Sequence, residues 1–437
     1  MMNTRITQIL RPVVAGVLLA ALALPAAALD LKTADGSWTF SFSGNVNVDY
    51  IWSSCQSLSS AVVVNGGLTC VGSESSSNVS NIGNGLLPAA FSFGAATTQN
   101  GIDLAAHLGL YPGIATNDGG SPNLQAGTKN GSSNTGLGST GLDIRQVYMT
   151  FGNKEMGTFT LGRNIGLFGA DVILNDMTLI GVGGPGSAAS AAPANTTLGG
   201  IGLGYIYTDW LAQIDYTTPD FSGFSLTVGV FDPINSLSEG NAAVQPKKAP
   251  GFHGKASYTA PFSDTTKLYV SVAFLTQEQD YVSPVLPPPP STGTDTPYSY
   301  TGNGIDVFAR LDVQDFEVFG YYYHATGLGT TALFNGGAFG LGQTRGSDGY
   351  LAQATYKFGA VKLGVNYGES KLDYANAADQ TANPNLVSSN KKATVGVYYS
   401  LTKNLTLLAE GSRTKSEAHV GGSNDATTIN AGAFLGF

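Results

Sequence analysis

The sequence predicts an all-β chain that folds as one closed, transmembrane antiparallel β-barrel of 16 strands. Three observations lead to this prediction. Apolar and polar residues alternate in segment after segment, the connections between the segments are short and long in turn, and charged residues make up only 12 % of the chain. Successive side chains of a strand point to opposite faces, so the alternation gives each strand an apolar and a polar side. A low charge content and 58 glycines suit a barrel whose outer face meets lipid.

The first 28 residues are predicted to be a signal peptide. Arg5 and Arg11 give a positive start, residues 13–24 are small or apolar, and residues 25–28 (PAAA) offer an A-x-A cleavage site. The alternative is a membrane anchor, but a run of about 12 residues is shorter than the roughly 20 that span a bilayer as a helix. Cleavage after Ala28 would leave 437 − 28 = 409 residues, 29–437, as a single barrel domain.

The predicted mature chain is acidic. Removing the signal peptide takes away two arginines and no acids, so the net charge becomes (21 − 2) − 30 = −11. This balance argues against nucleic acid or anionic lipid as the main partner, because both are negatively charged.

Cys55 and Cys70 are the only cysteines of the chain, and both follow the first strand in a Ser- and Gly-rich stretch. In an oxidising compartment two cysteines in one loop predict a disulfide, which would stabilise that loop by up to about 3 kcal/mol. The alternative, a metal or redox pair, has no His or acid cluster beside it.

The alternation is clearest in the first strand. One side carries Trp38, Phe40, Phe42, Val46, Val48 and Tyr50, and the other carries Ser41, Ser43, Asn45, Asn47 and Asp49. Sixteen such segments are expected at about 38–52, 86–97, 102–113, 142–151, 156–164, 204–217, 222–232, 251–259, 266–277, 303–312, 315–325, 348–358, 360–371, 391–401, 404–415 and 427–437. Long connections are expected at about 53–85, 114–141, 165–203, 233–250, 278–302, 326–347, 372–390 and 416–426.

This division of the connections predicts short periplasmic turns, long extracellular loops and both chain ends on the periplasmic side. In hydrocarbon every backbone N–H and C=O must be paired, and only closure of the sheet removes its two unpaired edges. Sixteen strands also make a barrel too wide for side chains to fill. We therefore expect an aqueous lumen.

Two sequence segments resemble those of a known family. Residues 145–152 (RQVYMTFG), followed by 157–163 (GTFTLGR), are similar to the strand–turn–strand signature of Gram-negative general porins, and residues 215–224 (DYTTPDFSGF) resemble that family's next periplasmic turn. The C-terminal Phe437, with apolar residues at alternate positions before it, is similar to the signal that the barrel-assembly machinery reads. Leu435 departs from the family, which more often has an aromatic residue nearby.

The resemblance implies a homotrimer in the outer membrane of a Gram-negative bacterium, surrounded by outer-membrane lipid and lipopolysaccharide. It implies passive diffusion of small hydrophilic solutes and ions, no cofactor and no metal. It also implies that the third long loop, here about 165–203, folds into the lumen as a constriction.

The third long loop opens with an apolar stretch that is unusual for a loop in water, which is normally polar. Packing against the inner wall would explain this stretch, and Asp171, Asn175 and Asp176 would then face the lumen. The alternative is that these acids only cap a short helix.

The parity of a residue, its odd or even position along a strand, decides which face it occupies. Most charged residues of the strands are assigned to the lumen in this way, because a charge facing lipid near mid-membrane costs roughly 2–4 kcal/mol. The lumen set comprises Asp49, Asp103, Asp209, Asp215, Asp306, Glu410, Lys255, Lys267, Arg310, Lys357 and Lys362. Lys255, His107 and Arg163 are expected to face the loop acids and to create a transverse field at the narrowest point. The alternative for each base is an ordinary solvated lumen residue, and the side of Arg145 stays open.

Three other functions compete with a diffusion channel. An enzyme is disfavoured because His107, His253, His324 and His419 are scattered and no nucleophile or metalloprotease motif is present, so no catalytic residue is predicted. A hydrolase assay would test it. A channel specific for one small organic compound shares the fold and differs only in its lining, and a structural or adhesive surface barrel would show no conductance.

Overall fold

The computed structural model describes residues 29–55, 64–69, 78–114, 142–185, 196–235, 243–244, 247–283 and 296–437. In these residues one antiparallel sheet of nineteen strands holds β1, β3 and β10 as short additions, and the other sixteen strands form its wall. The wall strands are β2 (Thr39–Cys55), β4 (Ala90–Gln99), β5 (Ile102–Pro112), β6 (Leu142–Asn153), β7 (Gly157–Ile165), β8 (Trp210–Thr217), β9 (Phe224–Phe231), β11 (Gly251–Ser263), β12 (Thr266–Ser283), β13 (Thr296–Val313), β14 (Phe316–Thr326), β17 (Gly346–Phe358), β18 (Val361–Leu372), β19 (Val387–Ser400), β20 (Leu405–Ala418) and β21 (Ser423–Gly436).

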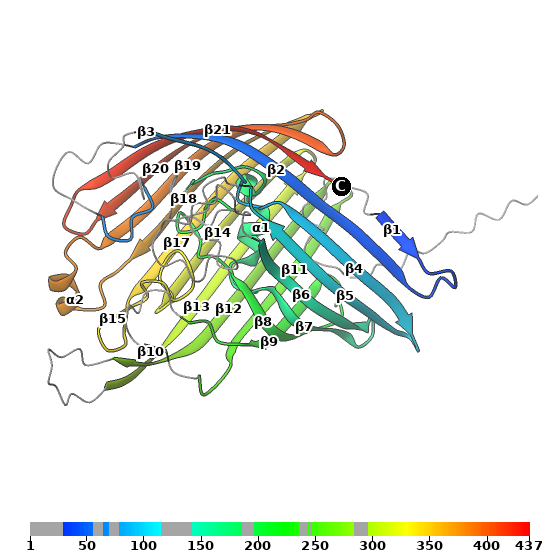
Figure 1. Ribbon diagram of the computed structural model, residues 1–437, viewed down its shortest axis with the longest axis horizontal. Helices are drawn as coiled ribbons and strands as arrows, with labels where there is room; N and C mark the ends of the chain where they lie inside the picture. The colour runs from blue at the N-terminus through cyan, green and yellow to red at the C-terminus, as the bar shows by residue number, and fades with distance from the viewer. Residues whose placement is uncertain are drawn as a thin grey trace, which may run out of the picture.

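The wall closes on itself. Each wall strand pairs with the next one along the chain, and β2 pairs with β4 on one side and with β21 on the other (Figure 1). Asn45 lies opposite Gly436 where the two ends of the wall meet. The predicted closed 16-stranded antiparallel barrel is confirmed, and closure leaves no unpaired sheet edge along the wall.

The remaining elements are short. They are β1 (Leu29–Lys32), β3 (Asn78–Gly83), β10 (Ala243–Val244), β15 (Ala338–Phe339), β16 (Gln343–Thr344), α1 (Ala170–Asn175), the 3-10 helix η3 (Met177–Ile180) and α2 (Ala377–Ala382). β1 and β3 pair with β2, β10 pairs with β12, and β15 and β16 form a separate hairpin. Among the described residues, no helix is both long and apolar enough to cross a bilayer.

Several expected boundaries differ from the structure. β8 begins at Trp210 rather than at 204, because residues 204–209 are drawn into the interior of the barrel and Asp209 takes a left-handed backbone conformation, with φ of 61°. β12 and β13 pair over many more residues than expected, and β20 and β21 are joined by 419–422 alone instead of a long loop. The alternation of apolar and polar residues weakens near the ends of strands. Strand pairing that extends beyond those ends is therefore hard to predict from the sequence.

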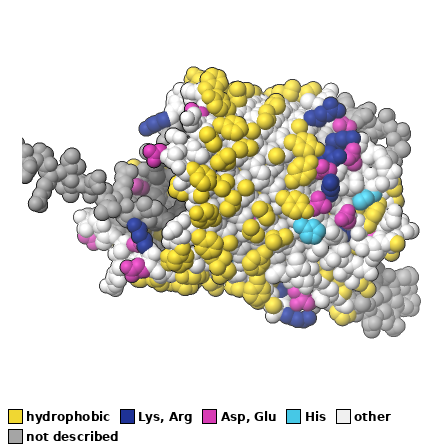
Figure 2. Space-filling model, turned by 180° about the vertical axis from the view of Figure 1, so that it is seen from behind, with side chains coloured by type: hydrophobic (Ala, Val, Ile, Leu, Met, Phe, Trp, Pro, Cys, Tyr) yellow, Lys and Arg dark blue, Asp and Glu magenta, His cyan; other side chains and the backbone are white. Residues whose placement is uncertain are grey.

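The two faces of the wall follow the alternation. Val46, Val48 and Tyr50 of β2 are exposed on the outside, whereas Asn45 and Asn47 are buried on the inside. Figure 2 shows the hydrophobic side chains of one outer face as a broad band, with acidic and basic side chains gathered along its edge. Aromatic rings meet on the outer face near the short turns, where the ring centroid of Phe159 lies 4.9 Å from the ring centroids of both Phe151 and Tyr216. Such rings are expected where a barrel meets a membrane interface.

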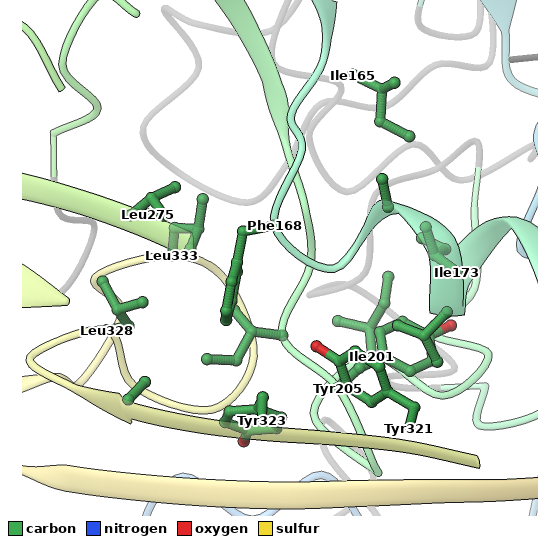
Figure 3. Packing of buried hydrophobic residues seen from close by; sticks show 14 of the residues in the cluster. Ile165, Phe168, Ile173, Ile201, Tyr205, Leu275, Tyr321, Tyr323, Leu328 and Leu333 are labelled. Carbon is green, nitrogen blue, oxygen red and sulfur yellow. The ribbon is translucent and has the colours of Figure 1, made fainter. Parts of the chain in front are cut away.

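The interior is divided between an apolar and a polar part. Buried side chains of residues 165–179, 201–211 and 328–334 pack against Phe308, Phe319 and other inward residues of β9, β12, β13, β14 and β17 (Figure 3). In that cluster Phe168 lies between Leu275, Leu328 and Leu333 on one side and Ile173 on the other. The inward residues near the short turns of β6 to β11 are polar and only half-buried, among them Thr150, Thr160, Thr217, Ser225, Thr227 and Ser257. Water therefore reaches this part of the lumen.

The predicted disulfide between Cys55 and Cys70 stays a prediction. Cys55 is buried at the end of β2, and Cys70 lies outside the described residues.

Candidate functional site

The connection between β7 and β8 contacts the inner face of the barrel, and its described residues, 166–185 and 196–209, are called the inward segment below. It carries α1 and η3, and α1 lies within the outline of the barrel (Figure 1). Its hydrogen bonds reach β11, β12, β13, β17, β18 and β20, so it is attached to the wall at several separate points.

The first attachment is made by Asp306 of β13. Its carboxylate accepts a hydrogen bond from the Gly169 N–H at 2.6 Å, and its other oxygen accepts one from the Ala273 N–H at 3.1 Å. Gly169 has a φ of 77°, a left-handed conformation that glycine adopts without a steric penalty, and it turns the chain into α1. Asp306 was predicted to face the lumen, and here it holds the backbone of the inward segment.

The second attachment is the ion pair of Asp171 and Lys255. The Lys255 ammonium lies 2.8 Å from Asp171 Oδ1, and the other carboxylate oxygen accepts hydrogen bonds from Ser271 Oγ at 2.6 Å and Tyr269 Oη at 2.9 Å. Both charged side chains are largely buried, with 15 % and 13 % exposed for Lys255 and Asp171. Three donors satisfy Asp171, so its charge is compensated at the wall.

Asn175, at the end of α1, makes the third attachment. Its side-chain oxygen accepts a hydrogen bond from the Arg310 guanidinium, and its backbone carbonyl accepts one from Gln353 Nε2 at 2.9 Å. Arg310 also pairs with Asp312 at 3.1 Å. The amide of Asn175 thus links α1 to β13 and its carbonyl links α1 to β17.

Asp176 has a structural part in the inward segment. It caps η3 by accepting a hydrogen bond from the Thr178 N–H at 2.9 Å, which agrees with the capping alternative. It also accepts hydrogen bonds from Tyr205 Oη at 2.9 Å and from Asn366 Nδ2 at 3.1 Å. Asp176 is buried, so its carboxylate holds two parts of the inward segment and β18 together.

Glu410 of β20 makes the last attachment. Its Oε2 accepts hydrogen bonds from the N–H groups of Val182 and Gly183 at 2.8 and 2.9 Å, and its Oε1 accepts one from Tyr398 Oη at 2.7 Å. Lys392 of β19 interacts electrostatically with Glu410 and Asp176, and it is wholly buried. Among the described residues, its ammonium has no hydrogen-bond partner.

Sequence reasoning missed Lys392, Gln353 and Asn366. Gln353 has the same parity as Lys357 on β17, and Asn366 has the same parity as Lys362 on β18, so that signal could have found both. Lys392 follows Lys391 at the start of the expected strand 391–401, where parity was not yet defined.

Among the described residues, His107 and Arg163 form no hydrogen bond or ion pair with the inward segment, although Arg163 interacts electrostatically with Asp209 at its end. The His107 ring packs against Tyr148, with ring centroids 5.0 Å apart, on the inner face of β5 and β6. Arg163 is exposed, and alternation along β7 puts it on the face of Phe159 and Leu161, which is the outer face.

The remaining predicted lumen acids are spread along the wall. Asp49 is buried and accepts a hydrogen bond from Asn430 at 3.0 Å, whereas Asp103 is bonded to Thr98 at 2.6 Å next to a short turn. Asp215 is buried and pairs with His253 at 2.8 Å. Asp209 accepts a hydrogen bond from the Trp210 N–H at 2.6 Å and precedes β8.

The remaining predicted bases lie near the short turns. Lys267 and Lys357 are exposed there. The Lys362 ammonium lies 5.1 Å from the centre of the Tyr398 ring, within the range of a cation–π contact.

A β-bulge decides the side of Arg145. Gly109 pairs with Gln146, and Leu110 pairs with Ile144, so Arg145 is the extra residue on β6. A bulge residue leaves the alternation, and Arg145 packs over the buried Tyr111 ring at 5.3 Å and pairs with Asp143 at 3.2 Å. Ile144 and Val147 on either side of the bulge are exposed on the outer face, while Arg145 is largely buried.

Comparisons with known proteins agree with this architecture. The family model for Gram-negative porins matches residues 15–419. Curated protein sequences contain no match to the chain.

Three solved structures resemble the barrel over nearly all of both chains. The outer membrane channel DcaP of Acinetobacter baumannii has a TM-score of 0.63 at 15 % identity and covers 93 % of this chain and 99 % of its own. Outer-membrane expressed OmpT of Vibrio cholerae has a TM-score of 0.53 at 14 % identity, covering 94 % and 100 %. Salmonella typhi OmpF, in complex with daunomycin, has a TM-score of 0.52 at 13 % identity, covering 93 % and 100 %. At these identities the likeness concerns the fold.

Proposed function

The chain belongs to the Gram-negative porin family and is an outer-membrane channel for passive diffusion of small solutes, and we propose that the inward segment sets the width of this channel. The observation that carries the proposal is the row of wall attachments at Asp306, Lys255, Gln353 and Glu410. A segment held at several points across the lumen narrows it permanently. The half-buried polar residues near the short turns would form a wider vestibule on one side, suited to hydrophilic solutes.

The proposal gives Asp171 and Asp176 another role than the one expected from the sequence, in which they create a transverse field across the lumen. Asp171 and Asp176 were expected to face the permeating solute, but both carboxylates are engaged by donors of the wall or of the inward segment. We propose that they hold the constriction in place. Ion preference would then depend on charges that have no such partners.

The test is conductance in a planar bilayer combined with size exclusion by neutral polymers. The wild-type chain should give discrete current steps and a defined polymer cut-off. Glu410→Ala removes the acceptor of two backbone N–H groups, so the cut-off size should increase. Glu155→Ala, in the turn 154–156, is the control and should leave it unchanged. An absence of current steps would argue for the structural or adhesive alternative, and an unchanged cut-off in Glu410→Ala would reject the constriction.

The oligomeric state is proposed to be a homotrimer. Arg163 supports subunit contact, because it is exposed on the outer face and its electrostatic partner among the described residues, Asp209, forms no ion pair with it. An outward arginine needs a counter-charge from a neighbouring subunit or from lipid headgroups, since a charge facing hydrocarbon is costly. Native mass spectrometry should give three times the mass of the chain, and Arg163→Glu should weaken the assembly. A monomer mass for the wild type would reject the proposal.

The finer parts of the family assignment complete the proposal. They are removal of residues 1–28 as a signal peptide, recognition of the C-terminal strand with Phe437 by the assembly machinery, contact with lipopolysaccharide, extracellular placement of the long loops, and the absence of enzymatic activity. The mass of the mature chain tests the first of these directly.

A further inference from the structure

Lys357 of β17 and Lys362 of β18 are direct cross-strand partners next to a short turn. Alternation places both on the inner face, because Thr355 beside Lys357 on that face is buried and Leu363 after Lys362 is exposed to the outside. Like charges directly opposite each other in a sheet are destabilising. The wall therefore carries an unfavourable pair at the mouth of the channel on the short-turn side.

Neither ammonium lies within ion-pair distance of a carboxylate in the described part of the chain. Two other cations of the inner wall do have such partners: Lys255 pairs with Asp171, and Arg310 pairs with Asp312. Glu317 and Glu410 attract Lys362 without forming an ion pair with it. The repulsion between the two lysines is thus only partly compensated by the protein.

The two lysines differ in freedom. Lys362 is half-buried and rests on the Tyr398 ring, and the hydroxyl of Tyr398 is in turn hydrogen-bonded to Glu410. Lys357 is exposed. One ammonium is therefore held in position, and the other can adjust to a bound group.

The charges around the pair add to its positive character. At the short-turn ends of β12 to β18, the inner face carries the bases Lys267, Arg310, Lys357 and Lys362 and the acids Asp312 and Glu317. Bases outnumber acids among these strand positions, although the adjoining turns add Asp264 and Asp315 and the chain as a whole is acidic. A local excess of one sign in a mouth with low-dielectric walls raises the concentration of oppositely charged solutes.

We propose that Lys357 and Lys362 form a binding site for small multivalent anions at the short-turn mouth of the channel. A carboxylate- or phosphate-bearing solute between them would replace their repulsion by two charge-assisted hydrogen bonds. The site would make this mouth prefer anionic solutes. This inference rests on the proposed channel and goes beyond it by naming a solute class.

The test uses the full chain in a planar bilayer, with citrate or inorganic phosphate added to one chamber at a time. Current steps without added anion establish the channel, so a failure of the channel is seen before the site is tested. Citrate should then reduce the current at lower concentration from one side than from the other. In Lys357→Gln/Lys362→Gln the Kd of the block should increase about tenfold, equivalent to about 1.4 kcal/mol. The reversal potential of this double variant in a KCl gradient should shift toward cation preference.

Two controls separate binding from misfolding. Lys403→Gln removes an exposed lysine from the turn between β19 and β20 and should leave block and reversal potential unchanged. Lys357→Gln alone changes only an exposed side chain and should raise the Kd at least about threefold, in proportion to one lost charge. Block by citrate but not phosphate would assign the site to carboxylates, and the reverse to phosphates. Equal block of wild type and both Lys357 variants would overturn the proposal.

Discussion

Lys255 Nζ lies 2.8 Å from Asp171 Oδ1, and the two residues are 84 positions apart in the chain. This contact joins β11 to α1, so the wall and the inward segment share one electrostatic link. Because both side chains are largely buried, removing either charge would leave the other without its partner in a poorly solvated place.

Asp171→Asn should therefore destabilise the barrel by about 2–4 kcal/mol, since it leaves the Lys255 ammonium buried and unpaired. Open-channel current noise should increase as α1 loosens. Chemical unfolding and single-channel recording would measure the two effects. The matched control is Asp264→Asn in the exposed turn between β11 and β12, and an equal unfolding midpoint for both variants would contradict the role given to the pair.

Arg345 and Asp379 link two of the long loops between wall strands, residues 327–345 and 373–386. Arg345 Nε and Nη2 donate to the two carboxylate oxygens of Asp379 at 2.7 Å each, and Asp379 is buried at the start of α2. Although burial opposes ionisation, the hydrogen bonds from Arg345, Ala375 and Asn383 lower the pKa of Asp379 to about 2. A carboxyl whose pKa is lower in the folded state stabilises that state above its ordinary pKa and loses this contribution as pH decreases from about 4 toward 2.

Residues 373–386 should accordingly be held less tightly in acid. The free energy needed to open this connection should be about 2 kcal/mol lower at pH 2 than at pH 5. Hydrogen exchange of these residues would show the change, while the wall strands stay protected. In Asp379→Asn the acid step should disappear and the segment should exchange faster even at pH 7. An identical pH profile for variant and wild type would show that this carboxyl does not control the loop.

Gly229 of β9 lies between Asp215 and His253, whose side chains meet across it. A Cβ at this position would come within 1.7 Å of Asp215 Oδ1. Gly229→Ala should therefore displace the buried pair and cost about 1–3 kcal/mol, the usual range for overpacking. Gly320→Ala is the control, because a Cβ there meets nothing within 4 Å. Urea unfolding in detergent micelles would compare them, and equal stability of both variants would refute the argument.

Val228 and Thr227 are neighbours on β9 that face opposite sides of the wall. Val228 is exposed to the outside, whereas Thr227 points inward and bonds to Thr217. Val228→Lys should reduce the free energy of folding into lipid vesicles by about 2–4 kcal/mol, and Thr227→Lys by less, since only the first charge faces hydrocarbon. Reversible folding titrations in vesicles measure both. A larger cost for Thr227→Lys would reverse the assigned faces.

Much of the wall was predictable because the alternation of a strand is a local property. The first strand, for example, shows its two faces between Trp38 and Trp52 without reference to any other part of the chain. Parity alone also assigned Asp306, Glu410 and Lys255 to the inner face, and in the structure all three contact the inward segment. It could not say that two of them would bind the backbone of a loop instead of lining a free pore.

Arg145 and Arg163 show where local patterns are insufficient. Parity along 145–151 left Arg145 open, and one inserted residue in β6 turned it inward onto Tyr111. A bulge is a property of the pairing between two strands, so neither strand shows it alone. Arg163, expected at the narrowest point, follows its own alternation to the outer face.

By itself, then, the sequence determined the number of strands, their two faces and the closure of the barrel, because side-chain alternation and backbone pairing in lipid admit few other solutions. Only the tertiary structure decided which charges meet, such as Asp171 with Lys255 and Asp379 with Arg345. Such contacts depend on strand register, bulges and the path of a loop across the lumen, and these are set by packing between residues far apart in the chain.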